Sequence, residues 1–271
     1  MSGYSATAIR SARSFLFVPG NRAELFAKAA SSGADVVVID LEDAVAPSDK
    51  TSAREYARTW LCAGNDAMIR INAADTPWYE ADLALIAEDC TPVMVPKAES
   101  SDAIRSFPDG TAVVALIETV VGIERSATVC SAPGMQRVAF GNMDLAAQLG
   151  VDPADREAML MARSTLVFTS AAAGLAAPID GVTAALTDQQ AIFDDVRYAR
   201  RLGMNGKLCV HPDQVSAVHQ ASAPSDEEVA WAQKVLAACD TGGGVSAAGG
   251  QMVDLPVVQR AKGIIDAVDR C

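Results

Sequence analysis

Two acidic residues come shortly after apolar runs of the kind that form buried strands. Glu118 directly follows the run AVVALI, residues 112–117, and Asp144 comes soon after RVAF, residues 137–140. A carboxylate that is buried without a partner is costly, and a hard divalent cation relieves that cost. Mg²⁺ favours one or two carboxylates together with waters and the substrate's own oxygens. We therefore expect Glu118 and Asp144 to bind Mg²⁺ directly.

A second group of charged residues can act around such a metal ion. Glu42 and Asp43 follow the apolar run DVVVID, residues 35–40, and we expect them to hold metal-bound water. Arg70 lies near the end of the run MIRIN, residues 68–72. Its guanidinium keeps its proton and matches a carboxylate with two parallel hydrogen bonds, which suits a substrate carboxylate or a developing oxyanion. A structural ion pair is the alternative role for Arg70.

Other polar residues also fall at or after the ends of apolar runs. They are Asp40, Lys97, Asp180 and His211. Each also suits a structural role, such as the N-cap of a helix for Asp180. The placement of all these residues after strands favours a metal-assisted enzyme more than any one of them does.

Other catalytic classes find little support in the sequence. Two histidines and six cysteines without a C-x-x-C pair do not suit a zinc cluster. So few histidines offer no persuasive Ser-His-Asp set, and the phosphate-binding patterns G-x-x-x-x-G-K-[ST] and G-x-G-x-x-G do not occur. Isolated cysteines indicate free thiols in a reducing compartment, so we expect a cytoplasmic protein.

Eight short apolar segments alternate with amphipathic segments along the chain. The predicted strands are Ser14–Val18, Asp35–Asp40, Ala67–Ile71, Val93–Val95, Ala112–Ile117, Arg137–Phe140, Pro178–Gly181 and Leu208–Val210. Helices are expected over residues 21–32, 48–62, 78–89, 101–107, 123–130, 155–173 and 188–202, and residues 212–221 are a candidate for the helix that closes the barrel. This alternation favours an α/β fold, a (β/α)8 TIM barrel, over a doubly wound sheet. In such a barrel the residues after the strands meet on one rim.

The chain continues beyond what a barrel requires. We expect the barrel to cover residues 1–222 and a C-terminal lid or helical extension to cover residues 223–271. The extension begins with Ser-Asp-Glu-Glu at Ser225, which suits a capped helix start, and ends with a predicted helix over Leu255–Val268. A glycine-rich stretch, TGGGVSAAGGQM, lies between its helices. Packing on a neighbouring subunit and a flexible linker are the two interpretations.

Composition excludes several classes of protein. The chain has 271 residues, of which 50% are hydrophobic and 21% charged, which excludes an intrinsically disordered chain. Its formal net charge of −12 disfavours nucleic-acid binding, because an acidic surface repels phosphates. No apolar run reaches the ~18 residues of a membrane span, and no signal-peptide region is visible.

Longer motifs occur in order along the whole chain. They are RSFLFVPGNR (13–22), DVVVIDLEDAVAPSDK (35–50), IRIN (69–72), VPKAES (95–100), ALIET (115–119), AFGNMDLAAQLG (139–150), APIDGV (177–182), GKLCVHPDQV (206–215) and GQMVDLPVV (250–258). In these motifs the chain resembles the citrate lyase beta-subunit-like branch of the HpcH/HpaI aldolase family. The resemblance implies a Mg²⁺-dependent TIM-barrel enzyme, a carbon–carbon lyase, that assembles as a trimer or a multiple of one.

The resemblance also implies roles for individual residues. Glu118 and Asp144 match the metal ligands of the family, and Arg70 matches its substrate-binding and oxyanion-stabilising arginine. Glu42 and Asp43 match the acidic pair near the metal-bound waters. These roles agree with those that the residue types and their positions suggest.

Asp254, in the segment MVDLP, resembles an acid that some acyl-CoA lyases insert from the adjacent subunit. Carried on a closing lid, it would act as the general acid/base toward the thioester enolate, whereas its alternative role is the N-cap of the last helix. The residues assigned to substrate binding are Phe17, Arg70, Lys97, Gly141 and Asn142. Candidates for the phosphates of coenzyme A are Arg13, Arg22, Lys50 and Lys97.

The implied reaction cleaves or forms a 3-hydroxyacyl-CoA thioester such as malyl-CoA or citramalyl-CoA. Its products are acetyl-CoA, or another acyl-CoA, and glyoxylate or pyruvate, by way of a metal-stabilised enolate. The expected partners are these small molecules and further copies of the chain, in a homotrimer or hexamer. Two alternatives stay open, which are the citryl-thioester lyase beta subunit of a multi-subunit citrate lyase and a malyl-CoA thioesterase. A non-catalytic barrel suits the charged set less well.

Overall fold

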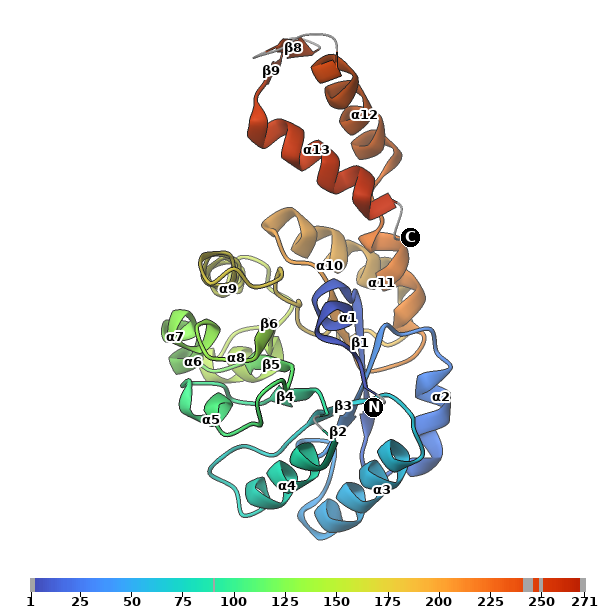
Figure 1. The fold of residues 1–271 in the computed structure, drawn as a ribbon, viewed down its shortest axis with the longest axis vertical. Helices are drawn as coiled ribbons and strands as arrows, with labels where there is room; N and C mark the ends of the chain where they lie inside the picture. Colours follow the sequence, from blue (N-terminus) through green and yellow to red (C-terminus); the bar gives the residue numbers. More distant parts are fainter. Residues whose placement is uncertain (1–2, 90, 241–245, 249–250, 269–271) are drawn as a thin grey trace. The chain divides into compact units, whose positions relative to one another are not determined.

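The computed structural model describes residues 3–89, 91–240, 246–248 and 251–268 of the chain. The chain divides into two compact units, Met1–His219 and Gln220–Cys271 (Figure 1). The expected boundary after residue 222 lies slightly further along, at the end of helix α11 (Gln214–Ser222).

A sheet of seven parallel strands forms the centre of the first unit. The strands are β1 (Ser14–Pro19), β2 (Val36–Asp40), β3 (Met68–Arg70), β4 (Val93–Val95), β5 (Val113–Ile117), β6 (Met135–Phe140) and β7 (Lys207–Cys209). Their order in the sheet is β6-β5-β4-β3-β2-β1-β7, so strands that are neighbours in sequence are also neighbours in space except at β7. These seven strands match seven of the eight predicted segments.

The eighth predicted strand, Pro178–Gly181, is not a strand but fills the gap between β6 and β7. It makes two isolated parallel bridges, Ala139 with Ile179 and Asp180 with Lys207. The amide of Phe140 donates to the Ile179 carbonyl, and the amide of Leu208 donates to the Asp180 carbonyl, both at 2.9 Å. Pro178 has no N–H to extend the ladder, which keeps the segment short. The predicted TIM-barrel class is confirmed, because the segment joins the two edges of the sheet.

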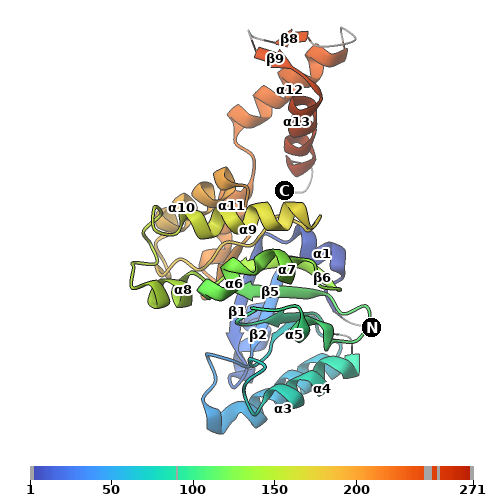
Figure 2. The ribbon, with the colours of Figure 1, turned by 90° about the vertical axis from the view of Figure 1, so that its left-hand side faces the viewer.

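Helices surround the strands. They are α1 (Ala6–Ser11), α2 (Phe26–Ala30), α3 (Lys50–Cys62), α4 (Tyr79–Asp89), α5 (Asp102–Arg105), α6 (Val120–Glu124), α7 (Ser126–Cys130), α8 (Asn142–Leu149), α9 (Leu160–Ala172), α10 (Gln189–Leu202) and α11. Helices α3 and α4 lie on one side of the strands and α9 and α10 on the opposite side (Figures 1 and 2). The predicted helix over residues 123–130 is divided at Arg125, which ends α6 and begins α7.

Two helices of the first unit were not among the predicted elements. Helix α8 follows β6 directly and carries Asp144 in its first turn. Helix α1 precedes β1, and Ile9 from it is buried in the core of the barrel. The guanidinium of Arg137, on β6, donates to the carbonyls of Ala12 at 2.6 Å and Ile9 at 3.3 Å. Helix α1 therefore closes the amino-terminal end of the barrel.

The second unit is built from two helices and a hairpin. Helix α12 (Asp226–Asp240) and helix α13 (Leu255–Val268) share a small core of Ala232, Val235, Val253 and Ala261. Between them β8 (Ser246–Ala248) pairs antiparallel with β9 (Gln251–Val253), where the sequence predicts a glycine-rich loop. At the start of α12, Ser225 and Glu228 bond to each other's backbone amides, which is the predicted capping arrangement.

Among the residues that the structure describes, no helix is both long enough and apolar enough to cross a membrane.

The closure of the barrel by Arg137 leads to a test of stability. Its side chain is fully buried and donates to three carbonyls, including that of Ala177 at 2.8 Å. We expect Arg137→Met to lower the free energy of unfolding by roughly 2–4 kcal/mol, because buried carbonyls lose their donor. Arg105→Met on exposed α5 serves as the control, with a change below about 0.5 kcal/mol. Equal losses in urea titrations of the two variants would contradict this role for Arg137.

Candidate active site

The predicted site residues gather at the carboxyl end of the barrel strands. Asp40 ends β2, Arg70 ends β3 and Glu118 directly follows β5. A cavity of about 400 Å³ opens there. Its wall includes the predicted residues Phe17, Asp43, Arg70, Glu118, Gly141, Asn142 and Asp144. Glu42 and Lys97 lie outside this wall but contact Arg70 and Glu118, respectively.

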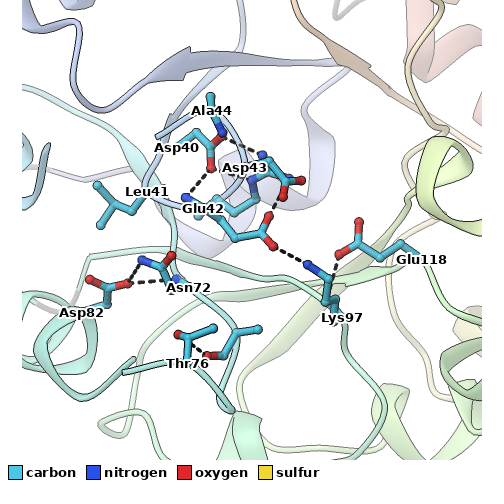
Figure 3. A network of polar contacts seen from close by, with 12 residues as sticks. Asp40, Leu41, Glu42, Asp43, Ala44, Asn72, Thr76, Asp82, Lys97 and Glu118 are labelled. Atoms are coloured by element: carbon cyan, nitrogen blue, oxygen red, sulfur yellow. Dashed lines mark hydrogen bonds and ion pairs between the residues drawn. The ribbon is translucent and has the colours of Figure 1, made fainter. Parts of the chain in front are cut away.

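Arg70 is held by Asp40 in a two-pronged ion pair. Its Nε and Nη2 donate to the two carboxylate oxygens of Asp40, each at 2.7 Å. The Asp40 carboxylate also accepts the amides of Glu42 and Ala44, both at 2.9 Å (Figure 3). Burial opposes the charge on Arg70, but Asp40 and the neighbouring acids raise the pKa of Arg70 further, so it stays a cation.

The remaining contacts of Arg70 face the other acids and an aromatic ring. Its Nη1 lies 3.3 Å from Oε2 of Glu42 and 3.4 Å from Oδ2 of Asp43. Its guanidinium carbon lies 4.7 Å from the centre of the Phe17 ring, which favours a cation–π contact. Phe17, part of the cavity wall, thus contacts the Arg70 guanidinium. Together with the hydrogen bonds to Asp40, this contact orients the guanidinium.

Lys50 anchors the loop after β2, which carries Glu42 and Asp43. The Lys50 ammonium is buried and donates to the carbonyls of Leu41 at 2.7 Å and Glu42 at 2.6 Å. Burial lowers the pKa of Lys50, and the nearby acids oppose this shift. Lys50 is a sequence candidate for binding the phosphates of coenzyme A. Its ammonium instead binds backbone carbonyls in the interior of the protein. Arg13 precedes β1, so it lies at the opposite end of that strand from the cavity.

The chain after Arg70 is fixed by a second buried ion pair. Nε of Arg54 donates to Asp82 at 2.8 Å, and the other Asp82 oxygen accepts the backbone and side-chain amides of Asn72 (Figure 3). Because Asn72 comes two residues after Arg70, this network anchors the chain directly after β3.

Glu118 is the most strongly perturbed acid of the site. Its side chain is buried, and its Oε1 accepts the backbone amide of Lys97 at 2.8 Å. Burial raises the pKa of Glu118 to about 8, with a further contribution from the charges of Asp144 and Glu42. Burial likewise raises the pKa of Glu42, and Arg70 and Lys97 oppose it. The protein alone therefore does not compensate a negative charge on Glu118.

Gly141 makes room for Glu118. A β-carbon at residue 141 would lie 2.2 Å from the β-carbon of Glu118, which no packed structure allows. The glycine lets β6 pass close to Glu118 and lets α8 begin immediately, so that Asp144 enters the same cavity. The side chain of Asn142, by contrast, bonds to both the amide and the carbonyl of Val182, at 2.9 Å and 3.1 Å.

The donor set fits a hard divalent cation. Among the described parts of the chain, no cluster of three or more His, Cys, Asp or Glu side chains is assembled around a metal position. Mg²⁺ requires no such cluster, because one or two carboxylates suffice when waters and substrate complete its ligands. Glu118 and Asp144 would supply these two carboxylates, and burial together with the charges of Asp144 and Glu42 raises the pKa of Glu118.

Two other candidate residues lie elsewhere. Asp254 belongs to the second unit, where its carboxylate accepts the amide of Val257 at 3.2 Å and so caps helix α13. Asp180 is buried in ion pairs with Arg163 at 2.7 Å and Lys207 at 2.8 Å, and does not act as a helix N-cap. Sequence reasoning assigns no specific role to Asp40, although its position at the end of a buried strand is an available signal.

Comparison with known proteins identifies the family. The model of the HpcH/HpaI aldolase/citrate lyase family matches residues 13–212. The chain belongs to this family. Within it, the chain is 38% identical over 255 residues to the citrate lyase subunit beta-like protein of Mycobacterium tuberculosis, with 92% of each chain covered. It is 30% identical over 255 residues to the (3S)-malyl-CoA thioesterase of Cereibacter sphaeroides, with 89% of each covered.

Solved structures of the HpcH/HpaI family share the fold. The crystal structure of CitE from Mycobacterium tuberculosis in complex with magnesium, acetoacetate and coenzyme A superposes with a TM-score of 0.85. The two chains are 36% identical, and the match covers 96% of this chain and 99% of that one. The family resemblance and the barrel class predicted from the sequence are thereby confirmed, and the chain is an enzyme of a lyase family.

The close approach at Gly141 gives a second test. We expect Gly141→Ala to lower the free energy of unfolding by roughly 1–3 kcal/mol, because the added methyl group displaces the backbone of Glu118. Gly263→Ala is the matched control, since a β-carbon added there would meet no atom within 4 Å. This second change lies within helix α13 and should be neutral or stabilising by up to about 1 kcal/mol. Denaturant titrations that place both variants at wild-type stability would contradict the steric argument.

Proposed function

We propose that the protein is a Mg²⁺-dependent carbon–carbon lyase. Its substrate is a 3-hydroxyacyl-CoA thioester of the malyl-CoA or citramalyl-CoA type, which it cleaves to, or forms from, an acyl-CoA and a 2-oxo acid. The observation that carries this proposal is the meeting of Glu118, Asp144 and Arg70 in one cavity at the carboxyl end of the barrel. Two carboxylates for a cation and one arginine for a carboxylate are what a 2-oxo acid product needs.

Glu118 and Asp144 would hold the metal ion, and Glu42 and Asp43 would bind its water molecules. When bound, Mg²⁺ acts as a Lewis acid on the hydroxyl and carbonyl oxygens of the substrate. Glu118 must give up its proton to serve as a ligand. Asp43, exposed beside Arg70, is placed to take part in proton transfer to and from bound water.

Arg70 would bind the carboxylate of the 2-oxo acid or the oxyanion that develops as the carbon–carbon bond breaks. Its orientation is established before substrate arrives, because Asp40 and Phe17 hold it. A donor that is already oriented costs no reorganisation during the reaction. Phe17 therefore acts in substrate binding by supporting Arg70.

The rest of the cavity wall suits the acyl part of the substrate. Leu116, Phe140 and Leu208 form apolar parts of this wall. They would exclude water from the reacting carbons. Gly141 and Asn142 contribute by shaping the wall, since one admits Glu118 and the other holds the backbone of Val182.

Asp254 is the proposed general acid/base toward the thioester enolate. Its carboxylate would protonate the enolate carbon after bond cleavage and would come from the C-terminal unit of an adjacent subunit. The motif MVDLP and the separate C-terminal unit support this role. The role requires a homo-oligomer, for which we propose a trimer or hexamer. It also requires that Asp254 exchange its bond to the Val257 amide for the substrate.

Two related activities are alternatives within the same site. The relative from Cereibacter sphaeroides favours hydrolysis of malyl-CoA, which would release free coenzyme A. The name of the Mycobacterium tuberculosis relative favours a subunit of a citrate lyase, which would act on a citryl thioester together with partner proteins. We place the enzyme in a reducing compartment, the cytoplasm, because Cys62, Cys130, Cys209 and Cys239 are free.

Product analysis distinguishes these activities. The purified protein is incubated with malyl-CoA and with citramalyl-CoA, with Mg²⁺ or with EDTA, and the products are identified by mass spectrometry. We expect Mg²⁺-dependent release of an acyl-CoA and a 2-oxo acid. Free coenzyme A as the only thiol product would instead establish a thioesterase. No turnover of either ester would reject the free-standing lyase for these substrates.

Variants connect the activity to the site. Loss of a residue that only hydrogen-bonds to a metal ligand costs roughly 10- to 100-fold in activity. Glu118→Gln removes a proposed ligand itself, so we expect a larger fall in kcat/KM. Asp254→Asn should lower kcat with little change in Mg²⁺ affinity, because it is proposed to act on carbon. Glu124→Gln, on the exposed surface of α6, is the control and should match the wild type. Wild-type activity in Glu118→Gln would exclude Glu118 as a ligand.

The raised pKa of Glu118 predicts proton release on metal binding. With a pKa of about 8, the carboxyl is mostly protonated at pH 7, whereas a metal ligand must be ionised. Binding of Mg²⁺ should therefore release close to one proton at about pH 7 and almost none at about pH 9. The affinity for Mg²⁺ should rise roughly tenfold per pH unit up to about pH 8 and then level off. Calorimetry in buffers of different ionisation enthalpy measures the released proton, and a pH-independent affinity would contradict the prediction.

A further inference from the structure

Lys97 has an unusual backbone conformation for a side chain of its size. Its φ is +47°, and among the residues that the structure describes it is the only one other than glycine with a positive φ. A residue with a β-carbon adopts this left-handed region only where its surroundings require it. Such conformations gather at functional sites, and here the residue follows β4 and contacts Glu118 of the cavity wall.

The left-handed turn allows Lys97 to contact two acids in different directions. Its backbone amide donates to Oε1 of Glu118 at 2.8 Å, while its ammonium binds Oε1 of Glu42 (Figure 3). The next amide, that of Ala98, bonds to the Leu116 carbonyl on β5, which fixes the loop beside the strand that precedes Glu118. Lys97 is therefore the link between the proposed ligand Glu118 and the cluster around Arg70.

Within the described part of the chain, the ammonium of Lys97 is the hydrogen-bond partner of Oε1 of Glu42. The Glu42 side chain is buried, and its Oε2 has no hydrogen-bond partner there, although Nη1 of Arg70 lies 3.3 Å away. Lys97 binds the side chains of both Glu42 and Glu118, so the two carboxyl groups lie within reach of one lysine. A buried carboxylate with an unsatisfied oxygen beside a cation site is a ready additional ligand for that cation.

We propose that Lys97 is a positioning residue that keeps Glu42 out of the ligand set of the metal ion. This inference rests on the proposed function. A third carboxylate on Mg²⁺ would strengthen metal binding but would occupy a place that the substrate's oxygens need. Lys97 prevents this by holding Glu42 through its ammonium while its amide orients Glu118. The residue thus acts on the metal site and not on the substrate, which differs from the role that its sequence position suggests.

Metal binding to the substrate-free enzyme provides the test. Mg²⁺ affinity is measured by calorimetry, and the number of waters on bound Mn²⁺ by the broadening of its paramagnetic resonance lines in ¹⁷O-labelled water. Lys97→Met should bind Mg²⁺ roughly tenfold more tightly, because a cation is lost and a carboxylate ligand is gained. Its Mn²⁺ should carry fewer waters than in the wild type. Its kcat should fall roughly 10- to 100-fold with less change in KM.

Three further variants make the test specific. Lys97→Arg retains the charge and should keep the wild-type water count, and Lys28→Met on exposed α2 is the control for loss of a lysine. Glu42→Gln should leave the water count of the wild type unchanged, because Glu42 is not a ligand there. Combined with Lys97→Met, it should return the count to the wild-type value. The Glu42→Gln measurement does not depend on whether Lys97→Met folds.

The outcomes separate this inference from the proposed function. A gain of water in Glu42→Gln alone would show that Glu42 is already a ligand and would overturn the inference. An unchanged metal site in Lys97→Met with a raised KM would also overturn it, in favour of a substrate contact. If the wild type binds neither Mg²⁺ nor Mn²⁺, the proposed function itself fails and the inference fails with it.

Discussion

The cost of burying carboxylates at the mouth of the barrel governs the arrangement of this site. Asp40 is fully compensated, because Arg70 and two backbone amides bind its oxygens. Among the described residues, Glu42 is hydrogen-bonded on one oxygen only, while its other oxygen lies 3.3 Å from Nη1 of Arg70. Glu118 accepts a single amide and has a pKa of about 8. Compensation thus decreases across the cavity from Asp40 to Glu118, and the charge that remains to be balanced lies where the cation is proposed to bind. The same gradient fits the two hydrogen bonds that hold Arg70 on Asp40 and the predicted release of a proton from Glu118 when a cation binds.

The barrel places a buried stabilising contact and the residues of the proposed active site at opposite ends. At the amino-terminal end, Arg137 donates to three backbone carbonyls and fastens helix α1. At the carboxyl end, the cavity wall includes Asp43 after β2, Arg70 at the end of β3, Glu118 after β5 and Asp144 after β6, as expected for this fold. Gly141 connects the two demands, because the barrel can be closed tightly around Glu118 only where β6 lacks a side chain. Gly141 therefore serves both the packing of the barrel and the position of Glu118.

Much of this arrangement could be predicted from the sequence, because strand ends followed by charged residues are local patterns. Seven of the eight strands, the barrel class and the family follow from such patterns. The prediction of a strand over Pro178–Gly181 was wrong. This segment makes one bridge to β6 and one to β7, which depends on the closed sheet and is not visible in four residues of sequence. The left-handed backbone of Lys97 and the pairing of Asn142 with Val182 could not be predicted either, because both are imposed by distant loops. Asp180 likewise found its partners Arg163 and Lys207 only through the fold.

Lyase and thioesterase chemistry differ in where water must be, and the cavity bears on that difference. Hydrolysis needs a water molecule held beside the thioester carbon, whereas cleavage of the carbon–carbon bond needs water kept away from the enolate carbon until it is protonated. The wall also presents Phe17, Leu116, Phe140 and Leu208, whose side chains offer no hydrogen bonds to a water molecule. The charged groups of the wall are Arg70, which pairs with Asp40 and Asp43, and the proposed metal ligands, where the 2-oxo acid is expected to bind. This wall supports the proposed lyase, because water would be bound on the side of the proposed metal ligands while the carbon that becomes the enolate would face apolar side chains.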